Sequence, residues 1–327
     1  MSVEKKQKGI ALIYILLIFS IITLMASQII MSLRLQTEKS IKFVEWIQAK
    51  HNAFGAEQYV ALLLEDDFDE DKKADKTGDY EREKRNISEL NYTVDNGTID
   101  AHVLDEQGFF NLNWLSSNEE TDKNYIDMLK RLLLNQFIDD SLVYKIMDWV
   151  SAGQTASELG AKDNVYLMEN SPHRIPEGPM ASVSELRLIE GVNEEIFNLL
   201  LPLVTVLPKK NKINLNAAIP ELIMSLSDNL SEGDAVAVLE ARKMDRLSSI
   251  EDLGKKAGIE NKLSAFRSEK IGFSSQFFSV YIRSVYGDTT FYLRTLLYRN
   301  MQGRMEVVER EIGSNDDWIR IGRSTEA

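Results

Sequence analysis

The sequence predicts an α+β protein with one long N-terminal helix, an antiparallel sheet, and a large all-α domain inserted into that sheet. Three observations lead to this expectation. An uncharged apolar run opens the chain, segments of period two stand near residue 90 and again after residue 272, and residues 116–266 between them have helical character. A helical block inside one sheet explains this order, because a hairpin near residue 90 would be only marginally stable alone.

The first element is an apolar run without a charged residue from Ile10 to Leu33. At a rise of about 1.5 Å per helical residue, it is long enough to cross the roughly 30 Å apolar core of a bilayer. A cleaved secretory signal has a shorter apolar stretch of about 7–15 residues. The sequence "ASQ" at 26–28 imitates the cleavage site of such a signal, but the apolar run continues past it. A retained membrane anchor is therefore favoured.

Gly9 stands between a lysine-containing leader and the first apolar residue. Cleavage after Gly9 would remove residues 1–9 and leave the whole apolar run on a mature protein that starts at Ile10. The order Lys8-Gly9 followed by "IALI" resembles the type III signal that prepilin peptidase cuts in type IV pilins and type II secretion pseudopilins. An ordinary signal anchor with a chance glycine is the alternative.

Helical character continues beyond the apolar run. Apolar residues recur at loosely helical spacing among charges from Leu35 to Phe54, and "AEQYVALLLE" at 56–65 is strong helix-forming sequence. One helix is therefore expected from Ile10 to about Leu64. Its residues 10–33 would lie in the membrane, and its residues 34–64 would form an amphipathic stalk in water.

The first part of the head is expected at residues 65–115. It begins with a charged run at 65–85 that is typical of a solvated linker. Alternating residues on both sides of Asn96-Gly97 predict a hairpin over 90–108, with these two residues as its turn. The segment "FFNLNWL" at 109–115 is expected to close this β portion.

The inserted helical domain is expected at residues 116–266. Segments such as "YIDMLKRLLLNQF" and "DDSLVYKIMDWV" have helical apolar spacing, and capping residues and glycines separate the helices that follow. After Gly272 the period returns to two. Residues 267–327 are therefore expected to add three consecutive strands to the head.

Composition restricts the function. The formal net charge of −13 repels polyphosphates, and the absence of cysteine excludes disulfides, thiol nucleophiles and thiolate metal sites. The three histidines, His51, His102 and His173, stand in no ligand or triad spacing. The chain also has no Gly-x-Ser-x-Gly, no HExxH and no phosphate-binding loop. No catalytic residue is proposed, and the chain is not expected to be an enzyme.

The sequence resembles the K subunit of type II secretion, a large minor pseudopilin, over essentially its whole length. Several segments carry the resemblance by their order and spacing: "KGIALI", "DEQGFFNLNWL" (105–115), "MDWV" (147–150), "SVSELRLIEGV" (182–192) and "VTVLPKKNKINLNAAIPELIMSL" (204–226). The resemblance implies a pilin-like head and a single-pass protein of the inner membrane with its C-terminal domain in the periplasm. It further implies a place at the tip of the pseudopilus, a complex with the I and J minor pseudopilins, and a role in protein export.

Tyr14 fits the expected tip position. Ordinary pilins carry a glutamate at the fifth position after the cut, where this chain has Tyr14. A bare carboxylate in lipid is costly unless it is paired, and in a growing filament it pairs with the N-terminal amine of the preceding subunit. The first subunit has no predecessor, so a non-acidic residue is expected there.

Calcium is the one cofactor that the resemblance suggests. Relatives bind it with acids clustered after the "DW" motif, and Asp148, Glu158 and Asp163 are the candidate ligands here. The region departs from that pattern, because Ser151 and Gly153 stand where acids are expected and a lysine, Lys162, adds positive charge. A calcium ion takes six to eight oxygen ligands, several of them anionic.

The main alternative is a minor pilin of a type IV pilus or competence system that binds DNA. "ELRLIEGV" and "INLNAAIPEL" each resemble part of a helix-hairpin-helix module, which offers turn amides to phosphate. The turn glycine, Gly191, is however flanked by acids that would repel phosphate: Glu190, Glu194 and Glu195. The only nearby basic cluster is Lys209, Lys210 and Lys212. The motif is therefore interpreted as a packing unit, and no nucleic-acid partner is expected.

Overall fold

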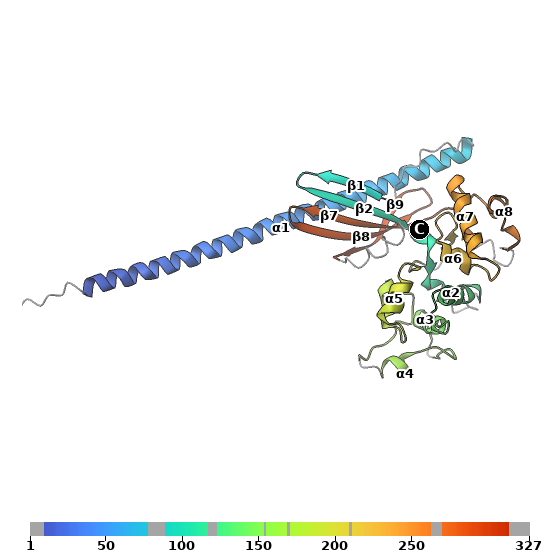
Figure 1. The fold of residues 1–327 in the computed structure, drawn as a ribbon, viewed down its shortest axis with the longest axis horizontal. Helices are drawn as coiled ribbons and strands as arrows, with labels where there is room; N and C mark the ends of the chain where they lie inside the picture. Colours follow the sequence, from blue (N-terminus) through green and yellow to red (C-terminus); the bar gives the residue numbers. More distant parts are fainter. Residues whose placement is uncertain are drawn as a thin grey trace, which may run out of the picture.

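The structure is a computed structural model that describes residues 10–77, 89–116, 123–153, 155–168, 171–208, 211–262 and 270–313. The long helix α1 spans Ile10–Thr77. Its first half projects away from the rest of the chain, and its second half lies along a sheet (Figure 1). The shorter helices gather at the end of the sheet that is farther from the projecting half of α1.

One five-stranded sheet forms the head. Its order is β1-β2-β7-β8-β9, and every neighbouring pair is antiparallel. The strands are β1 (Glu89–Val94), β2 (Gly97–Asp105), β7 (Phe277–Tyr286), β8 (Thr289–Arg299) and β9 (Met305–Ile312). β2 and β7 are neighbours although the whole helical block separates them in the chain. The expected α+β fold, with a helical block inserted into an antiparallel sheet, is therefore confirmed.

The inserted block leaves the sheet after β2 and returns before β7. Its helices are η1 (Glu106–Gly108), η2 (Leu112–Leu115), α2 (Lys123–Asn135), α3 (Leu142–Val150), α4 (Asp163–Tyr166), η3 (Val183–Leu188), α5 (Glu194–Leu200), α6 (Pro220–Ser225), α7 (Glu232–Met244), α8 (Ile250–Ala257) and η4 (Glu260–Lys262). Two short parallel pairs tie it together, β3 (Phe110–Asn111) with β4 (Val204–Thr205) and β5 (Ile213–Asn214) with β6 (Ile271–Gly272). These elements share one continuous apolar core.

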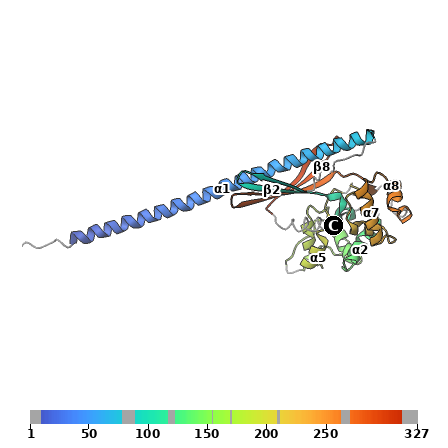
Figure 2. The same ribbon diagram turned by 45° about the horizontal axis from the view of Figure 1, so that its top comes forward.

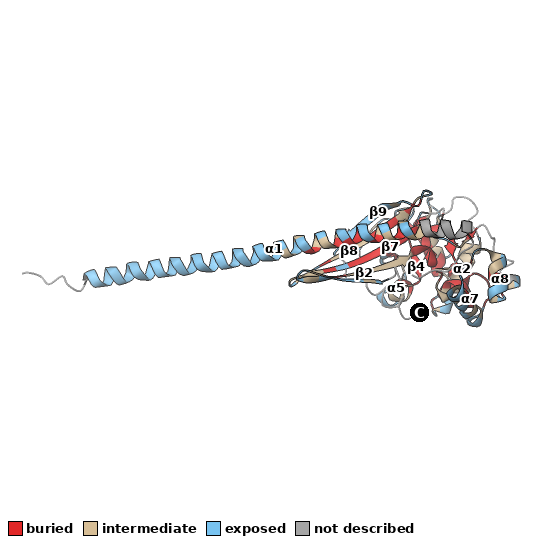
Figure 3. Ribbon diagram, turned by 90° about the horizontal axis from the view of Figure 1, so that it is seen from above, coloured by how far each residue is buried: buried red, intermediate tan, exposed pale blue. Residues whose placement is uncertain are grey.

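The second half of α1 packs on the sheet through a narrow apolar stripe. Its buried residues recur every three or four positions: Ala49, Ala53, Ala56, Val60 and Leu64. They contact apolar side chains of β2, β7 and β8. The three alanines have small side chains, so the helix can lie close to the sheet. Among the residues of α1 whose burial the structure describes, the buried ones lie along this stretch (Figure 3), and the same arrangement of helix over sheet is visible in Figure 2.

One acid interrupts the stripe. Glu57 is 3% exposed, and both its carboxylate oxygens accept hydrogen bonds of 2.8 Å from the guanidinium of Arg310 on β9. Thr295 Oγ1 on β8 donates a third bond of 2.6 Å. The carboxylate of Glu57 raises the pKa of Arg310 by hydrogen bonding and charge. Since one helical turn advances about 5.4 Å, a shift of α1 along the sheet would break all three bonds.

The end of α1 differs from the sequence-based expectation. The helix was expected to stop near Leu64 and to give way to a solvated linker over 65–85, but it continues to Thr77. Glu65 accepts bonds from Met305 N at 2.8 Å and from Arg304 Nη1 at 2.9 Å, so its side chain is held against β9. These tertiary contacts stabilise the helical turn after Leu64, although the composition of this segment predicts a solvated linker. Residues 78–88 of the expected linker lie outside the described part of the chain.

The hairpin forms as expected, but its turn is shifted by one residue. Val94 pairs with Gly97, so the two-residue loop is Asp95-Asn96, and Asn96 has a φ of 59°. Gly97 already belongs to β2. A Cβ on Gly97 would overlap the backbone carbonyl of Val285 on β7, so the glycine allows close strand packing and does not shape the turn.

The segment at 109–115 is also placed differently from the expectation. It was expected to close the first β portion of the head, yet Phe110, Leu112 and Trp114 are buried in the core of the helical block. Its short strand pairs with β4 of the block and not with the sheet. The three strands expected after Gly272 are confirmed as β7, β8 and β9.

We expect Glu57→Ala to lower the free energy of unfolding of the detergent-solubilised full-length protein by about 2 kcal/mol, because it removes the buried carboxylate that accepts from Arg310 and Thr295, while the partly exposed Arg310 guanidinium keeps part of its hydration. Urea denaturation followed by circular dichroism measures this change. Glu38→Ala removes an exposed acid of the same helix, which pairs with Arg34 at 3.4 Å, and should change the value by less than about 0.5 kcal/mol. Equal effects of the two substitutions would contradict the role assigned to Glu57.

Candidate functional sites

The N-terminal half of α1 has the properties of a membrane anchor. Among the described residues, α1 is the one helix that is long and apolar enough to cross a membrane. Its large apolar side chains from Leu12 to Leu33 are about half to two-thirds exposed, and Tyr14 lies among them at 63%. Ile10 is the first residue of the helix. Gly9 and the rest of the leader lie outside the described residues.

The water-facing half of α1 has a second face, opposite the sheet. Counting about 100° per helical residue, the exposed residues Ile41, Val44, His51, Gly55 and Leu62 lie on the side away from the buried stripe. Gly55 is an open point of this face, because a Cβ built there would meet no atom within 4 Å apart from the adjoining helix backbone. We call these five residues the outward face.

The apolar residues from Leu35 to Phe54 would be expected to offer one contact stripe to a partner helix, but they do not lie on one side of α1. Leu35 and Val44 are nine residues apart, which turns the helix by about 900°, so they point to opposite sides. Phe54 packs partly against its own sheet, with its ring 6.5 Å from that of Phe291. Only part of the expected stripe is therefore free to meet another helix.

A network of buried amides joins the helical block to the sheet. Gln107 donates from Nε2 to the carbonyl of Lys212 at 2.7 Å and accepts from the backbone N of Gln276 at 2.6 Å. Asn111 bonds both the N and the O of Leu207, at 3.0 and 3.1 Å. Gln107 connects the chain that leaves β2 with the chain that returns to β7, whereas Asn111 connects two segments within the block.

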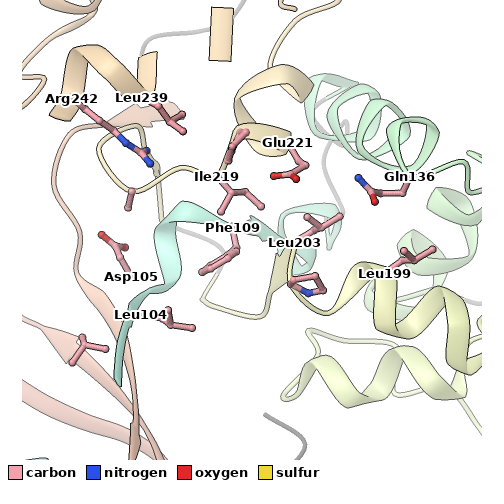
Figure 4. A pocket seen from close by; sticks show the side chains of 14 residues that line it. Leu104, Asp105, Phe109, Gln136, Leu199, Leu203, Ile219, Glu221, Leu239 and Arg242 are labelled. Carbon is pink, nitrogen blue, oxygen red and sulfur yellow. The ribbon is translucent and has the colours of Figure 1, made fainter. Parts of the chain in front are cut away.

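Asp105 stands where this network meets a cavity of about 280 Å³. The cavity lies between the end of β2 and the helical block, and its lining is mostly apolar, with residues such as Leu104, Phe109 and Leu203 (Figure 4). Burial raises the pKa of Asp105 to about 6, although bonds from Ser275, Gln107 and Asn214 act in the opposite direction.

Arg242 lies on the α7 side of the same cavity (Figure 4). Its guanidinium donates to the carbonyls of Leu215 at 3.2 Å and Ala218 at 2.7 Å. Burial lowers the pKa of Arg242, and the charge of Asp105 partly offsets this effect. Both charged groups are thus engaged in holding the backbone around the cavity. The sequence-based interpretation did not single out either residue.

The candidate calcium ligands do not come together. Asp148 accepts bonds from Ser157 N at 2.9 Å and Ser157 Oγ at 2.8 Å. Asp163 accepts from Ile175 N at 3.0 Å and lies 3.6 Å from Arg174. The third acid, Glu158, is exposed on the loop between them.

Within the described residues, no group of three or more His, Asp or Glu side chains is placed to hold a metal ion. The amine of Lys162 lies next to this region and donates to the carbonyls of Asp148 and Ser151. A positive charge at that place repels a cation. The expectation of a calcium site formed by Asp148, Glu158 and Asp163 therefore does not fit the structure.

The glycine turn at residue 191 has the shape of a helix-hairpin-helix but not the charge of a phosphate site. Gly191 has a φ of 89°, between η3 and α5. The cations beside the turn are engaged, since Lys145 pairs with Glu190 at 3.2 Å and Arg187 with Glu194 at 3.0 Å. The geometry therefore supports a packing unit. Lys209 and Lys210 of the expected basic cluster lie outside the described residues.

Comparison with known proteins agrees with this architecture. Residues 108–209 and 213–274, together half of the chain, match two sequence models described as type II secretion system (T2SS), protein K. The chain is 26% identical to type II secretion system protein K of Pseudomonas aeruginosa, over 98% of this chain and 100% of the relative. It is 27% identical to the Klebsiella pneumoniae protein of the same name, over 94% of this chain and 97% of the relative.

A solved structure has the same fold. A chain of the GspK-GspI-GspJ complex from the type 2 secretion system of enterotoxigenic Escherichia coli superposes with a TM-score of 0.68. The match covers 85% of this chain and 100% of the other, at 18% sequence identity.

A long apolar helix packed on an antiparallel sheet, with a helical block inserted between neighbouring strands, together with the match to type II secretion protein K sequences, defines a minor pseudopilin of type II secretion, a structural subunit of that system. Within this class, the chain belongs to the type II secretion system protein K family.

We expect Asp105 to make stability pH-dependent. Its pKa is about 6 in the folded protein against a usual value of 3.8, so folding favours the protonated form. Its stabilising contribution is complete below about pH 4 and is lost as pH rises through 6. Urea denaturation between pH 4 and pH 8 should show the unfolding free energy of the parent falling by about 2 kcal/mol relative to Asp105→Asn. A constant difference between the two proteins across this range would show that Asp105 is not the responsible group.

Proposed function

We propose that this subunit forms the tip of the type II secretion pseudopilus, starts its assembly and thereby supports protein export across the outer membrane. α1 anchors it in the inner membrane before assembly, with the head in the periplasm. The observation that carries the proposal is the combination of an anchor helix without an acid at its fifth mature position and a bulky block at the opposite end of the molecule.

Tyr14 supplies the first half of this argument. In a filament that grows from the membrane, an acid at this position pairs with the N-terminal amine of the subunit ahead. A subunit with none ahead would carry that acid unpaired in lipid, at a cost of several kcal/mol by analogy with other buried charges. Tyr14 carries no such charge, so a chain that starts the filament avoids the cost.

The helical block supplies the second half. It lies at the end of the sheet away from the anchor and extends to one side of α1 (Figure 1). Closely packed stalks leave little lateral room for a head, so such a block is hard to repeat along a shaft. At the end of a filament it meets no neighbour above.

Partners of the stalk are expected to be the I and J minor pseudopilins. The solved structure that shares this fold is named as a complex of GspK with GspI and GspJ. In this chain the outward face offers exposed apolar residues such as Ile41, Val44 and Leu62 to neighbouring stalk helices. Parallel helices bury such residues together.

The same chemistry does not favour the DNA-binding alternative. The net charge is −13, and the cations beside Gly191 are paired with glutamates. A phosphate backbone would have to displace these ion pairs and overcome repulsion from the acidic surface.

Processing provides one test of the assignment. We expect prepilin peptidase to cut between Gly9 and Ile10, so that the mature protein starts at Ile10. The lysines of the leader keep it in the cytoplasm, where the positive-inside rule places such charges. Intact-mass measurement of protein extracted from membranes decides the matter. A start near Gln28, or an uncut leader in cells with active peptidase, would contradict it.

Gly55 provides a test of the partner surface. An exposed glycine inside a helix costs about 1 kcal/mol relative to a good helix former, so Gly55→Leu should stabilise the isolated protein. The leucine side chain would also project from an open point of the outward face, so capture of co-expressed I and J from detergent extracts should fall several-fold. Gly55→Ala, which adds only a methyl group, should retain most of the complex. Undiminished capture by Gly55→Leu would remove this face from the interface.

Tyr14 provides a test of the tip position. Tyr14→Phe should leave secretion unchanged, because no hydrogen bond to a preceding subunit is required. Tyr14→Glu should be tolerated or mildly harmful, because an unpaired acid in lipid can remain protonated. Deletion of the gene should reduce secretion far more. Secretion assays with immunogold labelling of overexpressed pseudopili measure these effects, and label found repeatedly along the shaft would refute the tip assignment.

A further inference from the structure

Lys162 is a buried cation on the loop that joins α3 to α4. The residue is 5% exposed. Its Nζ donates to the backbone carbonyl of Asp148 at 2.7 Å and to that of Ser151 at 2.8 Å. Burial of an amine is costly unless its charge is compensated, so these two bonds hold the side chain in a defined place.

The two carbonyls belong to the end of α3. Ser151 is the C-terminal cap of this helix, and Asp148 lies in its last turn. The last carbonyls of a helix have no partner within it, and the helix dipole gives this end a partial negative charge. The amine of Lys162 satisfies both carbonyls and brings the favourable sign of charge. It therefore closes the loop onto the helix that carries the "MDWV" segment.

The acids of the loop are already engaged by donors from the chain. Both oxygens of Asp148 are bonded by Ser157, and Gly160 packs so closely that a Cβ there would overlap the same carboxylate. Asp163 is held by the backbone of Ile175. A calcium ion would require several such oxygens to converge on one point, together with backbone carbonyls. Here the carbonyls converge on an amine.

We propose that Lys162 is a built-in cation, which supplies from the chain itself the positive charge at the end of α3 and takes the place of the expected calcium ion. The loop between α3 and α4 then closes without any metal ion. This inference concerns the stability of the helical block and does not depend on the tip assignment.

The test measures the thermal unfolding midpoint of the detergent-solubilised full-length protein by circular dichroism. A ligand that binds only the folded state raises this midpoint, and the stabilisation grows with the logarithm of one plus its concentration divided by its dissociation constant. We expect the midpoint of the parent to be the same, within about 1 °C, in 5 mM EDTA and in 5 mM calcium chloride. This calcium concentration is on the order of the highest dissociation constants of calcium-binding modules. A rise of several degrees in calcium would overturn the proposal.

Substitution of the lysine provides the second arm. Lys162→Met keeps most of the apolar chain but removes the amine, which leaves the carbonyls of Asp148 and Ser151 buried without their donor. Two such losses correspond to a fall of the midpoint by about 4–8 °C in a domain of this size, with or without calcium. Lys255→Met, which removes an exposed amine on α8, is the matched control and should shift the midpoint by less than about 1 °C. A midpoint of Lys162→Met equal to that of the control would also overturn the proposal.

Discussion

The hydrogen bonds between the stalk helix α1 and the sheet of the head set the position of the membrane anchor relative to the helical block. Glu57 is the one acid in the buried stripe of α1, and it is held by Arg310 of β9 and Thr295 of β8. Apolar packing through alanines gives attraction but little axial registration, because neighbouring turns of the helix present similar surfaces. A charge with fixed donors has only one favourable position. The distance between the membrane anchor and the helical block follows from that position.

The next connection, from the sheet to the helical block, also depends on polar groups. The chain leaves β2 at Asp105 and returns at β7, and the side-chain amide of Gln107 accepts from Gln276 just before β7. Asn111 bonds Leu207 farther inside the block. Apolar side chains at this place could slide past one another. A side-chain amide that both donates to and accepts from backbone groups has a fixed orientation, so it defines the angle between the helical block and the sheet. Asp105 adds a group whose protonation stabilises the fold, since burial disfavours its charged form.

The ionisable side chains of Glu57, Asp105 and Lys162 have three different kinds of partner. At Glu57 a carboxylate and a guanidinium compensate one another. At Asp105 burial raises the pKa of the carboxyl group, and the neutral donors around it offset this effect only in part. At Lys162 an amine compensates the carbonyl end of a helix. A loop closed by its own side chain folds without a metal ion from the surroundings.

Periodicity in the sequence was sufficient for the anchor helix, the hairpin, the helical block and the three last strands, because each repeats one local pattern over many residues. The chain after Leu64 could not be predicted in this way, since its helix depends on contacts of Glu65 with β9 that lie far away in sequence. An acid at residue 57, four positions after Ala53 and three before Val60, was a visible signal of a buried partner, but only the fold shows that the partner is Arg310.

The three candidate calcium ligands illustrate the same limit. Their types and spacing are readable in the sequence, but whether carboxylates converge is decided by the directions of their side chains in the folded loop. By itself the sequence determined the order of the elements, the anchor and the family resemblance. Tertiary structure alone decided where buried charges find their partners, because those partners come from strands and loops distant in the chain.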